Sequence, residues 1–163
     1  MRIIGIDPGL TKTGVGIIDV NKNIACYVSS TTIYSSTSQQ LSIRLNHFHQ
    51  NILAIVNYYK PDTSAIEEIF LNSNPMSSLK LGHARGALIL SLALSGLEVH
   101  EYSSTKIKKT ITGVGRADKN QIKTMIKILL PNSQFKTEDE ADALAVALTH
   151  YQLNHQLNIR KII

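Results

Sequence analysis

Three short β-type runs follow one another in the first 33 residues, and this arrangement limits the possible folds more than any other feature of the chain. Residues 2–6 form an isoleucine-rich run that ends at the DPG sequence of residues 7–9, which predicts a buried strand and then a turn. Residues 13–20 and 24–33 have the composition of two more strands, and residues 21–23 suit a tight hairpin. The sequence therefore predicts an antiparallel three-stranded meander.

Helical and extended patterns alternate in the rest of the chain. Apolar residues spaced three and four apart predict an amphipathic helix over residues 39–59, which Pro61 ends. The other expected elements are, in order, a strand at 63–67, a helix from Pro75 to about Ser95 capped by Asn74, a strand at 99–102, helices at 104–111 and 119–130, and a last helix starting at Thr137 with capping-box spacing over 137–140. This order predicts an α/β fold with a mixed five-stranded sheet and helices on both faces. We expect a single domain over residues 1–163, with a tail that frays from about residue 155.

The composition indicates a folded protein with a polyanionic partner. Hydrophobic residues make up 43% and charged residues 18%, which excludes a disordered chain. Lys and Arg number 17 against 12 Asp and Glu, so the formal net charge is +5. Cys26 is the only cysteine, which excludes an internal disulfide framework and a multi-cysteine zinc site, and we expect it buried in a strand. No segment has the pattern of a signal peptide or a membrane span, so we expect a cytoplasmic location.

Acidic residues stand where the predicted strands end and where the last helix begins. They are Asp7 after the first strand, Glu67 and Glu68 after the fourth, and Glu138, Asp139, Glu140 and Asp142 in the last helix. Functional groups of an α/β sheet collect at strand ends, and we expect the first strand at the centre with the fourth beside it. Taken singly, each can be explained without a function: Asp7 as a turn residue, Glu67 as a solvated strand end, and the acidic residues of the first helical turn as a complement to the helix dipole. Asp142 is the exception, because it lies beyond the first turn in an apolar stretch, where an unpaired carboxylate is costly.

Several carboxylates in one cleft predict a metal site. They would repel one another until one took up a proton or a cation bound between them. Oxygen ligands without cysteine or paired histidine favour Mg²⁺ or Mn²⁺. Two such ions about 4 Å apart can activate a water and stabilise the leaving oxygen of a phosphodiester. A basic protein with this acidic cluster is therefore expected to be a metal-dependent nuclease.

Five segments, in this order and spacing, resemble the bacterial RuvC-type Holliday-junction resolvases: GIDPG (5–9), AIEEIF (65–70), LKLGHARG (79–86), TGVGRADK (112–119) and DEADALAVALTH (139–150). The resemblance implies a ribonuclease H-like fold and a homodimeric, Mg²⁺-dependent endonuclease, with Mn²⁺ able to substitute. It also implies symmetric nicking of opposing strands of four-way DNA junctions, with 5′-phosphate ends, in recombination and repair. A branch-migration helicase complex of the RuvA–RuvB type is the further partner that it implies.

The resemblance places the catalytic and metal-binding quartet on Asp7, Glu67, Asp139 and Asp142. Asp7, on the central strand, is expected to bridge two ions. Relatives carry either a carboxylate or a histidine at the third position. Here Glu138 and Glu140 flank Asp139, so compensation by either neighbour is an open alternative.

Basic residues gather between positions 106 and 127, and only Asp118 opposes them, which gives this segment 7 − 1 = +6 charges. They are Lys106, Lys108, Lys109, Arg116, Lys119, Lys123 and Lys127. We expect these residues to contact nucleic-acid phosphates. The alternative is that they form a helix face that contacts only solvent. The resemblance places junction-contacting lysines at Lys108 and Lys119, and Arg116 adjoins a glycine loop at 113–115 that would let a DNA strand approach. The resemblance also implies that Phe70 stacks on DNA bases. The alternative interpretation is that Phe70 packs in the protein core.

Other interpretations stay open at this point. Gly82 and Gly86 lie one turn apart, which suits packing either on the protein's own sheet or on a second copy, and we expect His83 and Arg85 at the surface or interface. The chain could also be a junction-binding protein without catalysis, half of an actin-like or sugar-kinase-like ATPase, or an RNA-acting relative of the same fold.

Overall fold

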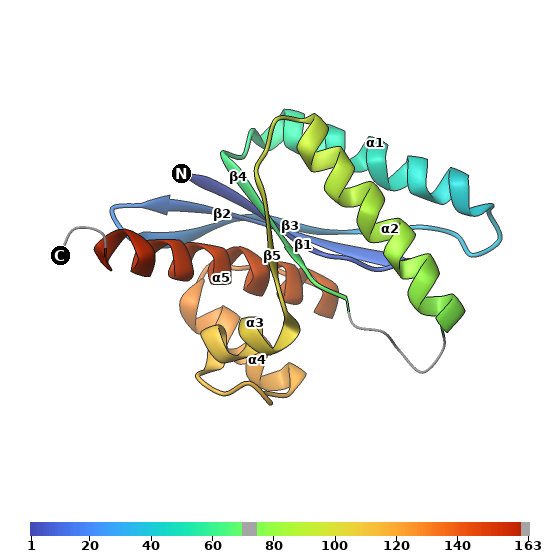
Figure 1. Ribbon diagram of the computed structural model, residues 1–163. Helices are drawn as coiled ribbons and strands as arrows, with labels where there is room; N and C mark the ends of the chain where they lie inside the picture. The colour runs from blue at the N-terminus through green and yellow to red at the C-terminus, as the bar shows by residue number, and fades with distance from the viewer. Residues whose placement is uncertain (70–74, 161–163) are drawn as a thin grey trace.

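The protein has one five-stranded mixed sheet between two layers of helices, as seen in the computed structural model (Figure 1). The structure describes residues 1–69 and 75–160, with side chains as far as residue 154. The strands are β1 (Arg2–Asp7), β2 (Lys12–Asn21), β3 (Ile24–Tyr34), β4 (Thr63–Glu67) and β5 (Val99–Tyr102). The helices are α1 (Leu41–Tyr59), α2 (Pro75–Leu94), α3 (Ser104–Thr112), α4 (Lys119–Leu129) and α5 (Glu138–Arg160). The α/β class with helices on both faces is therefore confirmed.

The strand order β3-β2-β1-β4-β5 places β1 at the centre of the sheet. β1 pairs antiparallel with β2, with Asp7 opposite Gly14, and parallel with β4, with Ile6 opposite Ile66. The β2–β3 hairpin turns at Lys22 and Asn23, whose φ angles of 48° and 63° are those of a two-residue hairpin loop. The predicted meander and the position of β4 beside β1 are both confirmed.

Helices α1 and α2 cover one face of the sheet (Figure 1). Side chains of β1 and β4 that point to this face, such as Ile4 and Ile66, are fully buried against Phe48 of α1 and Leu88 of α2. Both helices therefore belong to one apolar layer, which holds the end of β4 and the start of α2 on the same scaffold.

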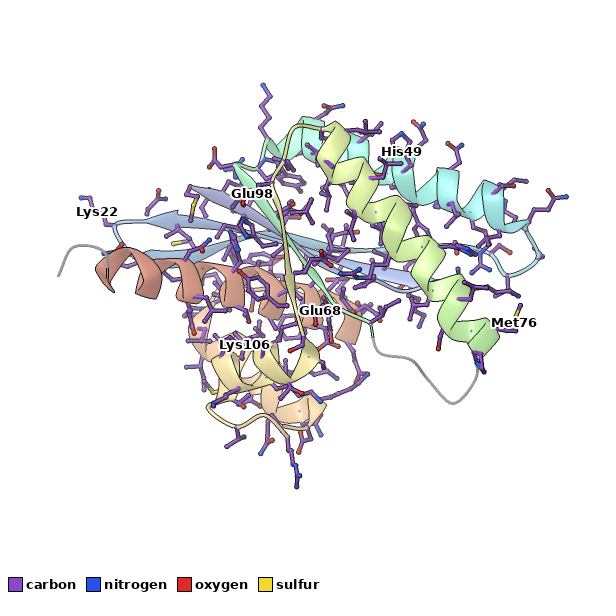
Figure 2. The ribbon with its side chains drawn as sticks, in the orientation of Figure 1. Lys22, His49, Glu68, Met76, Glu98 and Lys106 are labelled. Carbon is purple, nitrogen blue, oxygen red and sulfur yellow. The ribbon has the colours of Figure 1, made fainter. Side chains whose placement is uncertain are left out.

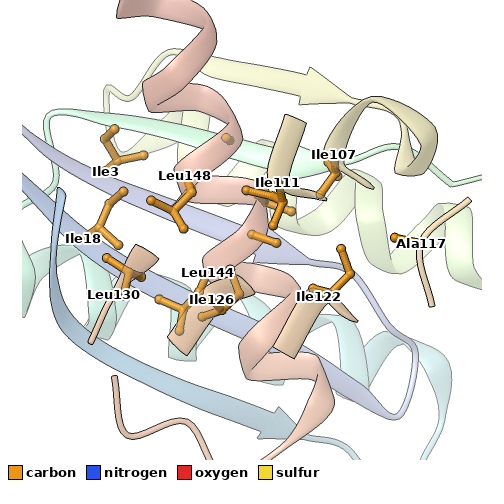
Figure 3. Close-up of a cluster of buried hydrophobic side chains, with 14 residues drawn as sticks. Ile3, Ile18, Ile107, Ile111, Ala117, Ile122, Ile126, Leu130, Leu144 and Leu148 are labelled. Atoms are coloured by element: carbon orange, nitrogen blue, oxygen red, sulfur yellow. The ribbon is translucent and has the colours of Figure 1, made fainter. Parts of the chain in front are cut away.

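Helix α5 covers the opposite face, and α3 and α4 pack against it (Figure 1). Ile3 and Ile18 of the sheet meet Leu144 and Leu148 of α5 in a core that α3 and α4 complete (Figure 3). The helix lies so close to the sheet that a Cβ atom on Gly5 would be 2.3 Å from the carbonyl oxygen of Ala143. The absence of a side chain at Gly5 therefore brings α5 down onto β1.

Cys26 differs from the sequence-based expectation, because it is exposed rather than buried. It follows the hairpin turn on β3, which is an edge strand of the sheet, and its β-type pattern alone does not reveal that position. The expected cap of α2 at Asn74 lies outside the described residues. Among the described residues, no helix is both long and apolar enough to cross a membrane.

Candidate active site

One pocket collects the four carboxylates that the sequence singled out. It is lined by Asp7, Glu67, Asp139 and Asp142, by the side chains of Ser104, Lys108 and Lys119, and by the apolar residues Ile107, Ile122 and Ala145. These residues come from five elements that lie far apart in the sequence: β1, β4, α3, α4 and α5. The site is thus made by the fold and not by any single motif.

Strand alternation explains why Asp7 and Glu67 point the same way. Successive residues of a strand face opposite sides of a sheet. Ile3 of β1 and Ala65 of β4 belong to the core under α5, whereas Ile66 belongs to the core under α1 and α2. Asp7 and Glu67 are in phase with the first pair, so both face α5. Glu68 is out of phase with them, and it is exposed at the end of β4, where Figure 2 labels it.

Helix α5 brings the other two carboxylates to the same place. Asp139 and Asp142 are three residues apart, so they lie on one side of the helix. Gly14, which pairs with Asp7, makes room for the first turn, because a Cβ atom there would lie 1.9 Å from the carbonyl oxygen of Asp139. The close approach of α5 to β2 therefore places both aspartates above Asp7.

The electrostatics of the pocket favour a cation. Burial, followed in order by the neighbouring charges of Glu67, Asp142 and Asp139, raises the pKa of Asp7 to about 8. Burial also raises the pKa values of Glu67 and Asp142. A hydroxyl hydrogen bond from Ser104 acts in the opposite direction on Glu67, as Lys119 does on Asp142. A cation bound among these carboxylates would relieve the same repulsion and would release the proton.

Two lysines share the pocket with the carboxylates. Burial raises the pKa values of Glu67 and Asp142, and Lys108 and Lys119, respectively, offset part of that rise. The Lys119 ammonium donates to Glu138 at 2.9 Å, and Lys123 donates to the other oxygen of the same carboxylate at 2.5 Å. These two hydrogen bonds lower the pKa of Glu138 to about 2, Lys123 having the larger effect. Glu138 therefore holds Lys119 beside the pocket while Lys123 stays outside it.

The carboxylates fit Mg²⁺ or Mn²⁺ in their chemistry, because every acidic ligand of the pocket is an oxygen donor. In the described part of the chain, no three His, Cys, Asp or Glu side chains already stand in an arrangement that could hold a metal ion. Ion binding would require Asp7, Glu67, Asp139 and Asp142 to turn toward one another within the pocket.

The neighbours of Asp139 are both engaged elsewhere. Glu140 is 6% exposed and accepts hydrogen bonds from Ser30 Oγ of β3 at 2.8 Å and from the Lys136 amide at 3.0 Å. The Thr137 hydroxyl accepts from the Glu140 amide at 3.1 Å, so only this half of the expected capping box forms. Glu138 is held by its two lysines. Neither glutamate lines the pocket, which argues against the alternative that one of them compensates for Asp139.

Two expected DNA-contacting residues lie away from the pocket or outside the described residues. Arg116 is exposed, one residue beyond the glycine loop, and it does not line the pocket. Gly113 ends α3 with φ = 82°, a left-handed conformation that explains a glycine there without reference to DNA. Phe70 lies outside the described residues. The roles of Arg116 and Phe70 therefore stay predictions.

Two residues near the site were not found by sequence reasoning. Ser104 is the first residue of α3 and hydrogen-bonds to Glu67, but a serine at a helix start is common and gives no distinct signal. Arg85 was expected at the surface or an interface. Its side chain is only 16% exposed and contacts the end of β4, whereas His83 on the same helix is exposed as expected.

The strand order and the helices on both faces, with carboxylates at the end of the central strand, define a ribonuclease H-like protein. The profile of the family described as "Crossover junction endodeoxyribonuclease RuvC" matches residues 3–150. Proteins of that name from Xanthobacter autotrophicus and Afipia carboxidovorans are 46% and 47% identical over 150 residues, which are 92% of this chain and 89% and 88% of theirs. The chain belongs to the crossover junction endodeoxyribonuclease RuvC family.

Solved structures agree with this membership. Thermus thermophilus RuvC superposes with a TM-score of 0.85 at 27% identity, covering 96% of this chain and 97% of that one. T. thermophilus RuvC in complex with a Holliday junction substrate has a TM-score of 0.85 at 28% identity, covering 92% of each chain. The yeast mitochondrial resolvase Ydc2, at 14% identity and a TM-score of 0.69, shares the fold. The resemblance seen in the sequence and the expected fold are both confirmed.

Proposed function

We propose that this chain resolves four-way DNA junctions by metal-dependent nicking in the pocket that Asp7, Glu67, Asp139 and Asp142 line. Family membership supports crossover junction endodeoxyribonuclease activity, and the relative solved with a Holliday junction supports that substrate. The observation that carries the chemistry is the convergence of four carboxylates with Lys108 and Lys119 in one pocket.

The four carboxylates would hold Mg²⁺, or Mn²⁺ in its place. When bound, the metal supplies an activated water and a stabilised leaving oxygen. The carboxylates themselves give up their protons, orient the cation and hold it against the end of the sheet. The proposed products are 5′-phosphate and 3′-hydroxyl ends.

Lys108 and Lys119 face the carboxylates and would contact the phosphate to be cut. An ammonium group in a partly buried pocket can offset charge that develops on phosphorus oxygens. Glu138 orients Lys119 without entering the pocket, so the lysine keeps a fixed place there. The remaining basic residues of α3 and α4, with Arg116, would provide sequence-independent contacts to the junction arms.

We propose that α2 forms a homodimer contact. One face of this helix exposes Met76, Leu79, Leu90 and Leu94, which recur at three-, four- and eleven-residue steps. On the described atoms, a Cβ at Gly86 would meet nothing within 4 Å, so the interpretation of Gly86 as a contact to the protein's own sheet is wrong. Two copies would bring two pockets to one junction, which suits symmetric nicking of opposing strands.

A pair of variants tests the dimer. Leu90 of α2 is 57% exposed, and Tyr58 of α1 is 77% exposed outside this face. We expect Leu90→Glu to sediment as a monomer and to lose paired nicking, and Tyr58→Glu to remain a dimer. Equal sedimentation of wild type and Leu90→Glu as dimers would contradict the α2 contact. A helicase partner of the RuvA–RuvB type rests on family resemblance and stays a prediction.

The activity is tested with a synthetic mobile four-way junction and a linear duplex of the same sequence. We expect symmetric nicks in the junction alone with Mg²⁺, none with EDTA, and none for Asp7→Asn. That variant should still bind the junction in a gel-shift assay, because binding rests on the basic surface. Junction binding by wild type without cleavage at any Mg²⁺ or Mn²⁺ concentration would instead support a non-catalytic junction-binding protein.

A further inference from the structure

Arg85 of α2 reaches the end of β4 without entering the pocket. Its Nε donates a hydrogen bond of 3.0 Å to the carbonyl oxygen of Glu67, the last residue of that strand. The same guanidinium forms an ion pair with Glu101 of β5. With only 16% of its side chain exposed, Arg85 is fixed between α2 and two neighbouring strands.

The peptide group that follows Glu67 is held from both ends. Arg85 binds its oxygen, and its amide, which belongs to Glu68, donates to the carbonyl oxygen of Tyr102 at 2.9 Å. Beyond this bond the sheet ends, and Glu68 is exposed at the point where the chain leaves β4 (Figure 2). The Arg85 bond is therefore a side-chain replacement for a strand ladder at the place where the ladder stops.

The two hydrogen bonds anchor the end of β4 at Glu67. If the strand end frayed, the N, Cα and C atoms of Glu67 would move, and these atoms set the direction in which its side chain leaves the strand toward α5. Arg85 acts through this backbone contact and not as a charge on the carboxylate. Lys108 is the cation that lowers the pKa of Glu67, and Glu101 neutralises Arg85 locally.

We propose that Arg85 is a positioning residue that anchors the end of β4 through the Glu67 carbonyl oxygen and so holds the Glu67 carboxylate in the metal-binding pocket. The proposal rests on the metal-binding function proposed above. Contacts that orient a metal ligand without touching the metal commonly alter metal affinity about 10–100-fold when they are removed. The planar fork of arginine is needed to bind a carbonyl and a carboxylate together, and lysine does not provide it.

The test measures Mn²⁺ binding to the purified protein by electron paramagnetic resonance, with wild type, Arg85→Gln, Arg85→Lys and Glu101→Gln. We expect Arg85→Gln to weaken Mn²⁺ binding about tenfold and to raise by a similar factor the Mg²⁺ concentration for half-maximal junction cleavage. The rate at saturating metal should recover to within a few fold. Arg85→Lys, which keeps the charge, should recover only part of the affinity, and Glu101→Gln should shift it in the same direction by less.

Arg2→Gln is the matched control. Arg2 also donates to a backbone carbonyl, that of Tyr59 at 2.6 Å, and to a carboxylate, that of Asp19, but at the opposite end of β1 from Asp7. We expect it to lower thermal stability without changing Mn²⁺ affinity. The Arg85 proposal is overturned if Arg85→Gln binds Mn²⁺ as wild type does, or if Arg2→Gln loses as much affinity. If Arg85→Gln does not fold, unchanged affinity in Glu101→Gln overturns it.

Failure of the underlying function gives a different result. If wild type and Asp7→Asn bind Mn²⁺ alike, the pocket is not the metal site, and the proposed function fails before Arg85 is considered. If Asp7→Asn loses binding while Arg85→Gln keeps it, only the role of Arg85 fails.

Discussion

Gly14 lies against the backbone of Asp139, at a distance that no other residue type permits. A Cβ atom on Gly14 would be 1.9 Å from the Asp139 carbonyl oxygen, far inside van der Waals contact. Because Gly14 pairs with Asp7 across β1 and β2, this contact fixes the height of α5 directly above the carboxylate of the central strand. The site therefore depends on a residue that has no side chain.

Replacing Gly14 with alanine is expected to displace the first turn of α5. The added methyl group meets backbone atoms that cannot rotate away, so we expect a loss of about 1–3 kcal/mol in the free energy of unfolding. Junction cleavage by the folded protein should fall at least tenfold, because Asp139 and Asp142 move together. Urea unfolding and single-turnover cleavage measure the two effects. Gly86→Ala is the control, because a Cβ atom there meets no neighbouring atom, and it should stabilise the monomer fold slightly. Wild-type cleavage by Gly14→Ala would contradict the role given to Gly14.

Glu67 and Glu68 form a matched pair that differs only in strand phase. Glu67 lines the pocket, whereas Glu68 is exposed and faces away from it. We expect Glu67→Gln to reduce cleavage by a factor of about 100 or more, and Glu68→Gln to stay within about twofold of wild type. Cleavage rates on one junction at saturating Mg²⁺ make the comparison. Comparable losses in both variants would mean that the phase of β4 is not what selects the ligand.

The raised pKa of Asp7 predicts a stability effect of defined sign. In the metal-free protein its folded-state pKa is about 8, against an ordinary value of 3.8, so the folded state keeps a proton that the unfolded state releases. The free energy of unfolding should therefore fall as pH rises from about 4 to about 8. Asp7→Asn removes the contribution of Asp7 to this dependence, and in EDTA at pH 8 it should be more stable than wild type by about 1–3 kcal/mol.

Addition of Mn²⁺ should reverse that order. Wild type gains stability by binding the ion, whereas Asp7→Asn gains little. Thermal unfolding at pH 5 and pH 8, with EDTA or Mn²⁺, measures both parts. An Asp7→Asn protein that is no more stable than wild type in EDTA at pH 8 would show that the fold does not raise the pKa of Asp7.

A comparison of Lys119 with Lys123 distinguishes a role inside the pocket from a contribution of positive charge alone. Both donate to Glu138, but only Lys119 also lines the pocket. We expect Lys119→Met to slow junction cleavage by a factor of about 100 at saturating DNA, and Lys123→Met to slow it less than about fivefold. Junction affinity at moderate salt should fall by a similar small amount in both. Equal cleavage rates in the two variants would remove Lys119 from the reaction.

Much of the fold could be predicted from the sequence, because its local signals agree with one another. Strands at 63–67 and 99–102 have the observed bounds, and most other element ends agree to within about two residues. The exception is α5, which continues to Arg160 although the tail was expected to fray from about residue 155. The prediction that Cys26 is buried was wrong, because the position of its strand at the sheet edge is a property of the whole sheet. A β-type run does not show how well its own side chains will be covered.

The candidate site was predictable only in part. The residue types and their positions at strand ends indicated Asp7, Glu67, Asp139 and Asp142, and the structure gathers all four in one pocket. Contacts between distant segments were not predictable. The hydrogen bonds of Glu140 to β3 and of Arg85 to Glu67 depend on which helix face meets which strand, and no short motif encodes that.

Crystals grown with Mn²⁺ and measured for anomalous scattering test the central claim most directly. We predict an anomalous peak in the pocket, with oxygen atoms from Asp7, Glu67, Asp139 and Asp142 as its protein ligands, and loss of that peak in Asp7→Asn. A peak bound only by other residues, or an empty pocket at Mn²⁺ concentrations that support cleavage, would contradict it.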